Sequence, residues 1–96
     1  MPINYMKSDF DLSGLLGRAL LLMRMAGPKA LSENGETSVS RWKNIGQGRA
    51  RLGTEELETL VRMFPAYQQW LLTGVAETSV AQTTPHDSGE VVEINA

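Results

Sequence analysis

The sequence predicts an all-α fold, a compact domain of five helices with a flexible C-terminal tail. Two segments, residues 12–26 and 57–64, repeat large apolar residues at the spacing i, i+3, i+4, i+7, which is typical of one helix face. No alternation of apolar and polar residues flanks the single Asn-Gly turn signal, so a β-hairpin is not expected there. We expect an N-terminal arm in residues 1–8, the helical domain in residues 9–74, and an acidic, disordered tail in residues 75–96.

The first helix is expected over about residues 9–25. Ser8 or Asp9 can cap its N-terminus, because both side chains accept hydrogen bonds from free backbone N–H groups. Arg18 and Arg24 mark its polar side. The apolar stripe is broad enough for the helix to be buried on more than one side.

A short second helix is expected over residues 29–33. Gly27 ends the first helix, and Pro28 can begin the second, since proline is favoured at the first helical position. Asn34 and Gly35 then form a turn, because both residue types tolerate positive φ.

The third helix is expected over residues 37–45, with Thr37 or Ser38 as its cap. Val39 and Trp42 are three residues apart, so they share a face that can anchor the helix to the core. The opposite face would then carry polar groups, among them the side chains of Thr37, Arg41 and Asn44.

A glycine-rich basic loop follows, over residues 46–53. Residues 37–53 contain no acid and four cations, which are Arg41, Lys43, Arg49 and Arg51. Residues 48–54 read GRARLGT, which resembles a phosphate-binding P-loop but lacks its lysine and its preceding strand. A nucleotide-phosphate site is therefore not expected.

The fourth helix is expected from Thr54, its cap, to Pro65, which ends it. Glu55 and Glu56 lie in its first turn, where carboxylates complement the helix dipole, and we expect them on a solvated face.

The fifth helix is short and apolar. Tyr67 and Trp70 share a face that should close the core against the first helix, and Gly74 is a natural C-terminal cap. Residues 75–96 are polar and acidic, and the chain's single histidine, His86, is expected to be solvated there.

The composition indicates one intracellular domain. Ninety-six residues with 42% hydrophobic content suffice for a small core, and the absence of cysteine excludes disulfides and thiolate metal sites. The longest apolar run, residues 19–23, is too short to cross a bilayer, and the first residues do not form a signal peptide. We expect a cytoplasmic protein without metal or cofactor.

The charge is unevenly distributed. Residues 14–74 carry eight cations and five acids, whereas residues 75–96 carry four acids and no cation, within a net charge of -2. A basic core is compatible with contacts to nucleic-acid phosphates, which depend on local charge. The outward face of the third helix suits the DNA major groove, although a merely solvated helix would have the same residue types.

Several segments resemble lambda-repressor-like, Xre/Cro-type helix-turn-helix proteins of phages and bacteria. The resemblance covers about residues 12–74 and is carried by residues 39–44 (VSRWKN), 53–60 (GTEELETL) and 67–74 (YQQWLLTG). The second helix is shorter than usual in this family, and the turn after it is wider. The resemblance implies a compact helical domain whose third helix enters the major groove.

The resemblance also implies roles for individual residues in binding double-stranded DNA. Base edges would be faced by Thr37, Ser38 and Arg41. The DNA backbone would be approached by Ser40, Lys43, Asn44 and Gln47, and phosphates by Arg49, Arg51 and Lys29. Arg41 is the expected sequence reader, because a guanidinium can pair with two acceptors of guanine.

The leading interpretation is a sequence-specific transcriptional regulator, a repressor acting as a homodimer and associated with the nucleoid when DNA-bound. The fifth helix or residues 91–94 would supply the dimer contact. The alternative is an antitoxin or adaptor that binds a protein partner through its acidic tail. An enzyme is not expected, because no acid/base constellation lies on a predicted helix.

Overall fold

The computed structural model describes residues 10–76 and 82–88, and it confirms the all-α prediction. Within these ranges the chain forms helices and no strand. The helices are α2 (Leu15–Ala26), α3 (Pro28–Glu33), α4 (Val39–Gly46), α5 (Thr54–Met63), the 3-10 helix η1 (Pro65–Tyr67), α6 (Gln68–Thr73) and α7 (Pro85–Ser88). The five helices expected from the sequence correspond to α2 to α6. The expected N-terminal arm, the capping residues Ser8 and Asp9, and residues 91–94 lie outside the described residues.

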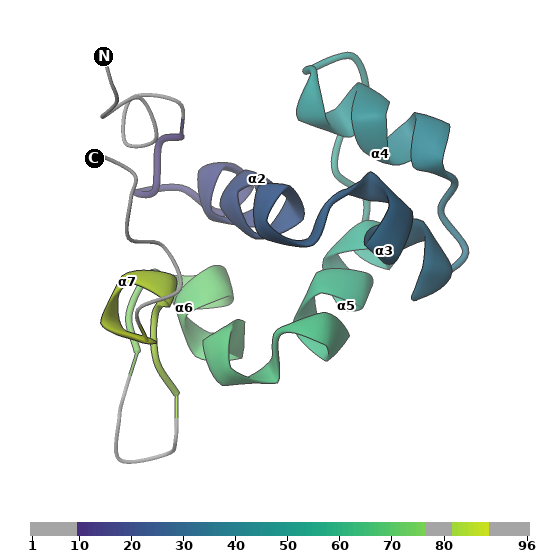
Figure 1. Ribbon diagram of the computed structural model, residues 1–96. Helices are drawn as coiled ribbons and strands as arrows, with labels where there is room; N and C mark the ends of the chain where they lie inside the picture. Colours follow the sequence, from purple (N-terminus) through teal and green to yellow (C-terminus); the bar gives the residue numbers. More distant parts are fainter. Residues whose placement is uncertain (1–9, 77–81, 89–96) are drawn as a thin grey trace, which may run out of the picture.

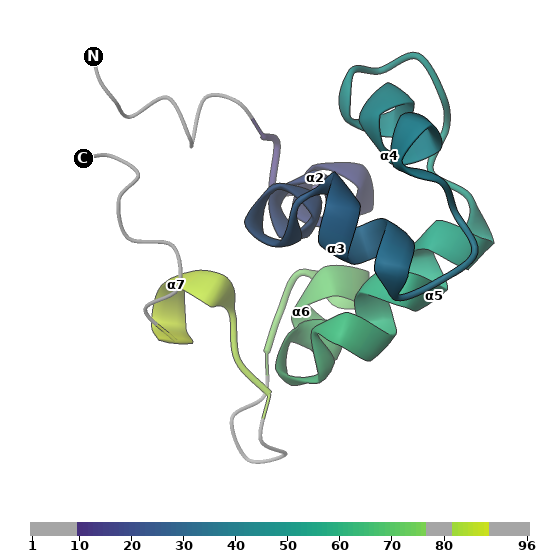
Figure 2. The same cartoon turned by 45° about the vertical axis from the view of Figure 1, so that its right-hand side comes forward.

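Helix α2 is the centre of the arrangement. It packs against α3, α5 and α6, while α4 packs mainly against α3. In Figures 1 and 2, α4 lies at one end of the molecule and α6 and α7 lie at the other. None of the described helices is both long and apolar enough to span a bilayer.

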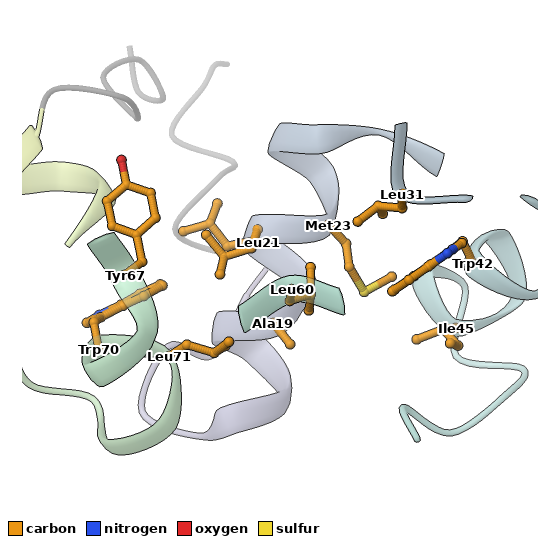
Figure 3. Close-up of a cluster of buried hydrophobic side chains, with 11 residues drawn as sticks. Ala19, Leu21, Met23, Leu31, Trp42, Ile45, Leu60, Tyr67, Trp70 and Leu71 are labelled. Atoms are coloured by element: carbon orange, nitrogen blue, oxygen red, sulfur yellow. The ribbon is translucent and has the colours of Figure 1, made fainter. Parts of the chain in front are cut away.

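One continuous hydrophobic core joins the helices α2 to α6. Figure 3 shows the α2 side chains between two groups, one from η1 and α6 and one from α3 and α4. The buried apolar residues are Ala19, Leu21, Leu22 and Met23 of α2, Leu31, Trp42, Ile45 and Leu60, and Tyr67, Trp70 and Leu71. Tyr67 and Trp70 therefore close the core, as the sequence predicts.

The first helix begins later than expected, at Leu15 rather than near residue 9. Before it, Asp11 forms a turn in which its carboxylate accepts from the backbone N–H and the hydroxyl of Ser13, at 3.1 and 2.6 Å. This turn lies directly over Gly17, where a Cβ would collide with the carbonyl oxygen of Asp11. Only glycine therefore lets the segment cross α2 so closely.

The prediction that Arg18 marks the polar side of the first helix is wrong, because its side chain is buried. It is 5% exposed. Its Nε donates to the carbonyl oxygen of Leu71 at 3.0 Å, and its Nη1 donates to that of Leu12 at 2.9 Å. The buried guanidinium thus joins the last turn of α6 to the segment that enters α2, by pairing with carbonyls that have no partner within a helix.

The chain after α6 is described over residues 75–76 and 82–88, and the disordered tail expected over residues 75–96 stays a prediction. Gly74 ends α6 with φ 86°, as predicted for a C-terminal glycine. Further on, Thr83 donates its N–H to the carbonyl of Ala66 at 2.8 Å, and the Gln82 amide accepts from the Gln69 N–H at 2.8 Å. Gln82 and Thr83 therefore lie against η1 and α6, and His86 is exposed, as expected.

Candidate nucleic-acid interface

Helices α3 and α4 form a helix-turn-helix unit at one end of the domain. Asn34 ends α3, with its side-chain amide donating to the carbonyl of Ala30 at 2.8 Å. Five residues then separate the two helices, a wide turn. Ser38 is the N-cap of α4, and its hydroxyl accepts from the Arg41 N–H at 3.1 Å. Of the two capping residues expected from the sequence, Ser38 is thus the one used.

Helix α4 is anchored through Trp42 and Ile45. These side chains are 1% and 2% exposed and lie in the shared core, with Met23 and Leu31 nearby (Figure 3). Val39, the other expected anchor, is half-buried. Two buried residues three apart fix the rotation of the helix about its own axis.

This rotation places four polar residues on the outer face of α4. Ser40, Lys43 and Gln47 are exposed, and Asn44 is half-buried between them. They follow the spacing i, i+3, i+4, i+7, which defines a single helical stripe. All four were expected at the interface. The resemblance placed them beside the DNA backbone, and the helical spacing also placed Asn44 on the face opposite Val39 and Trp42.

Thr37 is not on this face, and the prediction that it faces outward is wrong. It is 7% exposed, and its hydroxyl donates to the Glu56 carboxylate at 2.7 Å. Because α4 begins at Val39, Thr37 precedes the helix and does not follow its periodicity. The chain turns inward at this residue, where its hydroxyl has a buried acceptor.

Arg41 likewise does not present a free guanidinium. Its side chain is 43% exposed, but Nε donates to Glu56 at 3.0 Å and Nη2 donates to the carbonyl of Arg51 at 2.9 Å. Arg41 thus joins α4 to the first turn of α5 and to the glycine-rich loop. The expected role of Arg41 at base edges stays a prediction, and the structure adds that its guanidinium also bonds to Glu56 and to the Arg51 carbonyl.

Glu56 accepts hydrogen bonds from three residues of this region, Thr37, Arg41 and Gly53. This role was not predicted from the sequence. Its side chain is 4% exposed, not solvated as expected. Burial by itself would raise the pKa of Glu56. Hydrogen bonds from Arg41, Thr37 and the Gly53 N–H, together with the Arg41 charge, outweigh burial and lower the pKa to about 2. The N-cap of α5 is Gly53 and not the expected Thr54, so the sequence contains no Ser/Thr-x-x-Glu capping box that would have indicated the burial of Glu56.

The loop after α4 carries two exposed cations, Arg49 and Arg51. The Asn44 carbonyl accepts the Arg49 N–H at 2.8 Å, and Gly48 adopts φ 77°, which favours glycine. The loop therefore folds back on the end of α4. Lys29 is exposed in the first turn of α3, the other element of the helix-turn-helix unit.

These features define a small all-helical domain with a helix-turn-helix unit at one end. No protein-family description and no curated protein matches the sequence. Among solved structures, the chain is similar to Pf6r from the filamentous phage Pf6 of Pseudomonas aeruginosa PA01. The two share 37% sequence identity and a TM-score of 0.73, over 76% of this chain and 96% of that one. The chain therefore belongs to the same family as Pf6r.

Proposed function

We propose that this protein is a sequence-specific DNA-binding transcriptional regulator of the lambda-repressor-like type. In this proposal it acts as a repressor, binds as a homodimer, and inserts α4 into the major groove. The observation that carries the proposal is the outer face of α4, a polar stripe fixed in rotation by Trp42 and flanked by exposed cations. An α-helix that presents polar side chains on its outer face fits the width of the major groove. The likeness to a phage protein supports the same proposal.

The proposed base-reading residues are Ser40, Lys43, Asn44 and Gln47, because they form the stripe opposite the buried side of α4. Lysine can donate to the acceptors of guanine, and the amides of asparagine and glutamine can pair with adenine in two hydrogen bonds. Arg41 has a positioning role, since its guanidinium holds α4 against Glu56 and the loop.

The proposed phosphate contacts surround this stripe. Arg49 and Arg51 are exposed on the loop after α4, and Lys29 is exposed on α3. Ser38, exposed at the N-terminus of α4, can donate its hydroxyl hydrogen to a phosphate oxygen while its oxygen caps the helix. These contacts would supply affinity without sequence preference.

A dimer is part of the proposal because one α4 offers few base contacts, and two-fold sites double them. Leu72 and Val75 are 46% and 63% exposed at the C-terminal end of α6. Leu72 lies in α6 and Val75 lies just beyond it, and α6 is at the end of the molecule opposite α4 (Figures 1 and 2), where two exposed apolar side chains are suited to a contact between copies. We propose this end of α6 as the dimer contact.

Selection of bound duplexes from a random pool, followed by sequencing, tests the proposal. We expect enrichment of two-fold symmetric sites whose half-sites are about 10 base pairs, or a multiple, apart. A pool without any enriched sequence after repeated selection would contradict a sequence-specific regulator.

Two variants should separate base reading from phosphate contact. Gln47→Ala should relax the preference at one position of each half-site by about 1–3 kcal/mol. Arg49→Gln should leave the selected sequence unchanged and should reduce the slope of log affinity against log salt by about 1 for each copy bound. Each variant is the control for the other, and Arg49→Lys should retain the wild-type slope. The assignment is wrong if Gln47→Ala weakens all sequences equally.

A further inference from the structure

Residues 82–85 contact the start of α6 and are not part of the proposed DNA face. The side-chain amide of Gln82 accepts a hydrogen bond from the Gln69 N–H at 2.8 Å and donates one to the Pro65 carbonyl at 3.0 Å. Gln69 lies in the first turn of α6, where backbone N–H groups lack an acceptor within the helix. Gln82 therefore supplies an acceptor that the helix itself does not contain.

A backbone hydrogen bond and a proline complete this contact. The Thr83 N–H donates to the Ala66 carbonyl at 2.8 Å, and the side chain of Pro85 is fully buried. On the side of η1 and α6, all three hydrogen bonds use backbone groups. The site therefore recognises a short segment that offers a glutamine, a backbone N–H and, three residues after the glutamine, a proline.

The chain returns along α6 to make this contact. Gly74 ends α6, whereas Gln82 contacts the beginning of the same helix, beside η1. Five residues, 77–81, connect Ala76 to Gln82, so the chain reverses its direction within a short connection. Short connections of this kind favour the exchange of a segment between two copies, because an extended connection carries the segment to the neighbouring molecule instead.

This contact adjoins the proposed dimer contact. Gln82 and Leu72 line the same hollow beside α6. Leu72 and Val75 are exposed apolar side chains at the end of this helix. A second copy that reaches the site with its own segment would come to lie next to these side chains, and their burial between the copies would be favourable.

We propose that residues 82–85 of one copy bind η1 and α6 of a second copy, and that two copies exchange these segments to form the homodimer. A second copy fits the site because it carries the segment that the site binds within one chain. The exchange is reciprocal, so each copy gives and receives the same contacts. The importance of this homodimer for binding two-fold DNA sites rests on the proposed function, whereas the exchange itself does not.

The balance between monomer and dimer follows from what the exchange changes. Each hydrogen bond of the segment exists in both forms and cancels between them. Within one chain a short connection keeps the segment at an effective concentration of about millimolar. The apolar contact at Leu72 and Val75, which only the dimer contains, must therefore supply the preference for a second copy.

Cross-linking of single-cysteine chains tests the exchange, because the sequence contains no cysteine. Ala66→Cys and Thr83→Cys keep the two backbone groups that bond to each other, and neither side chain is buried. The two full-length variants are mixed and oxidised, with one of them labelled with ¹⁵N. We expect a disulfide from residue 66 of one chain to residue 83 of the other, identified by mass spectrometry after digestion.

Three further variants show what the cross-link depends on. Gln82→Ala in the Thr83→Cys chain should reduce its yield about tenfold, because the segment loses both side-chain hydrogen bonds. His86→Gln, a change at an exposed residue of the same segment, should leave the yield unchanged. Leu72→Ser in both chains should lower the yield several-fold. Circular dichroism should show the wild-type helix content for all of these chains.

Two outcomes would overturn the exchange. One is a chain carrying both Ala66→Cys and Thr83→Cys that forms its disulfide internally, while the mixed single variants form none between chains even at millimolar concentration. The other is an equal effect of Gln82→Ala and His86→Gln. Enrichment of two-fold duplexes by a chain without exchange would leave the proposed regulator intact. Exchange in a chain that enriches no duplex would support the inference and count against the regulator alone.

Discussion

Replacing Glu56 with glutamine will lower the free energy of unfolding at neutral pH by about 3 kcal/mol. The Glu56 carboxylate is buried and accepts hydrogen bonds from Thr37, Arg41 and the Gly53 N–H. These contacts lower its pKa from 4.5 to about 2, so the folded state favours the charged form strongly. A neutral amide of the same size keeps the shape but loses this preference. Chemical unfolding of both chains at neutral pH measures the difference.

The same pKa shift fixes the pH dependence of this contribution. Because the folded-state pKa lies below the unfolded value, the stabilisation is complete above about pH 4.5 and is lost as the pH falls towards 2. The difference between wild type and Glu56→Gln should therefore shrink across this window. Glu58→Gln, a change at an exposed site on the same helix, should show almost no difference at any pH. A constant gap between wild type and Glu56→Gln from neutral to acidic pH would contradict this account.

Replacing Arg18 with methionine will destabilise the domain by about 3 kcal/mol. Methionine fills much of the same space but leaves the carbonyl oxygens of Leu71 and Leu12 without their donors. Both ends of the α2–α6 contact should loosen as a result. For a domain of this size the expected fall in the unfolding temperature is about 12–24 °C, measurable by circular dichroism.

Arg24→Met is the matched control, because Arg24 lies on the same helix and its guanidinium is exposed, over the Phe10 ring at 5.8 Å from the ring centroid. We expect its unfolding temperature to change by only a few degrees. Equal effects of the two substitutions would show that charge on α2, rather than the buried contacts of Arg18, is what stabilises the domain.

The helices themselves were predictable because local signals agree with tertiary packing. Apolar spacing located α2 and α5, Pro28 and Gly74 marked boundaries, and Trp42 marked the buried side of α4. At these positions the local backbone conformation and the packing of the core favour the same residue type. The sequence pattern alone therefore predicts the structure there.

The errors arose where a polar side chain turns inward to a partner distant in sequence. Thr37 meets Glu56 across 19 positions, and Arg18 meets Leu71 across 53. Residue type predicts exposure for both, whereas the buried acceptor that reverses this expectation becomes visible only in three dimensions. Starting the third helix two residues too early moved Thr37 onto a face that it does not occupy.

The contact of Arg41 with both Glu56 and the Arg51 carbonyl has a consequence for the entropy of association. It ties α4 to the neighbouring loop within the folded chain, so in the proposed complex the spacing between the side chains for bases and the side chains for phosphates would be set before a duplex binds. Ordering that is completed during folding does not have to be repeated on docking, which leaves more of the contact energy available as affinity. A substitution that releases Arg41 from these contacts would therefore leave the fold unchanged. It would increase the entropy cost of binding a duplex in the proposed complex.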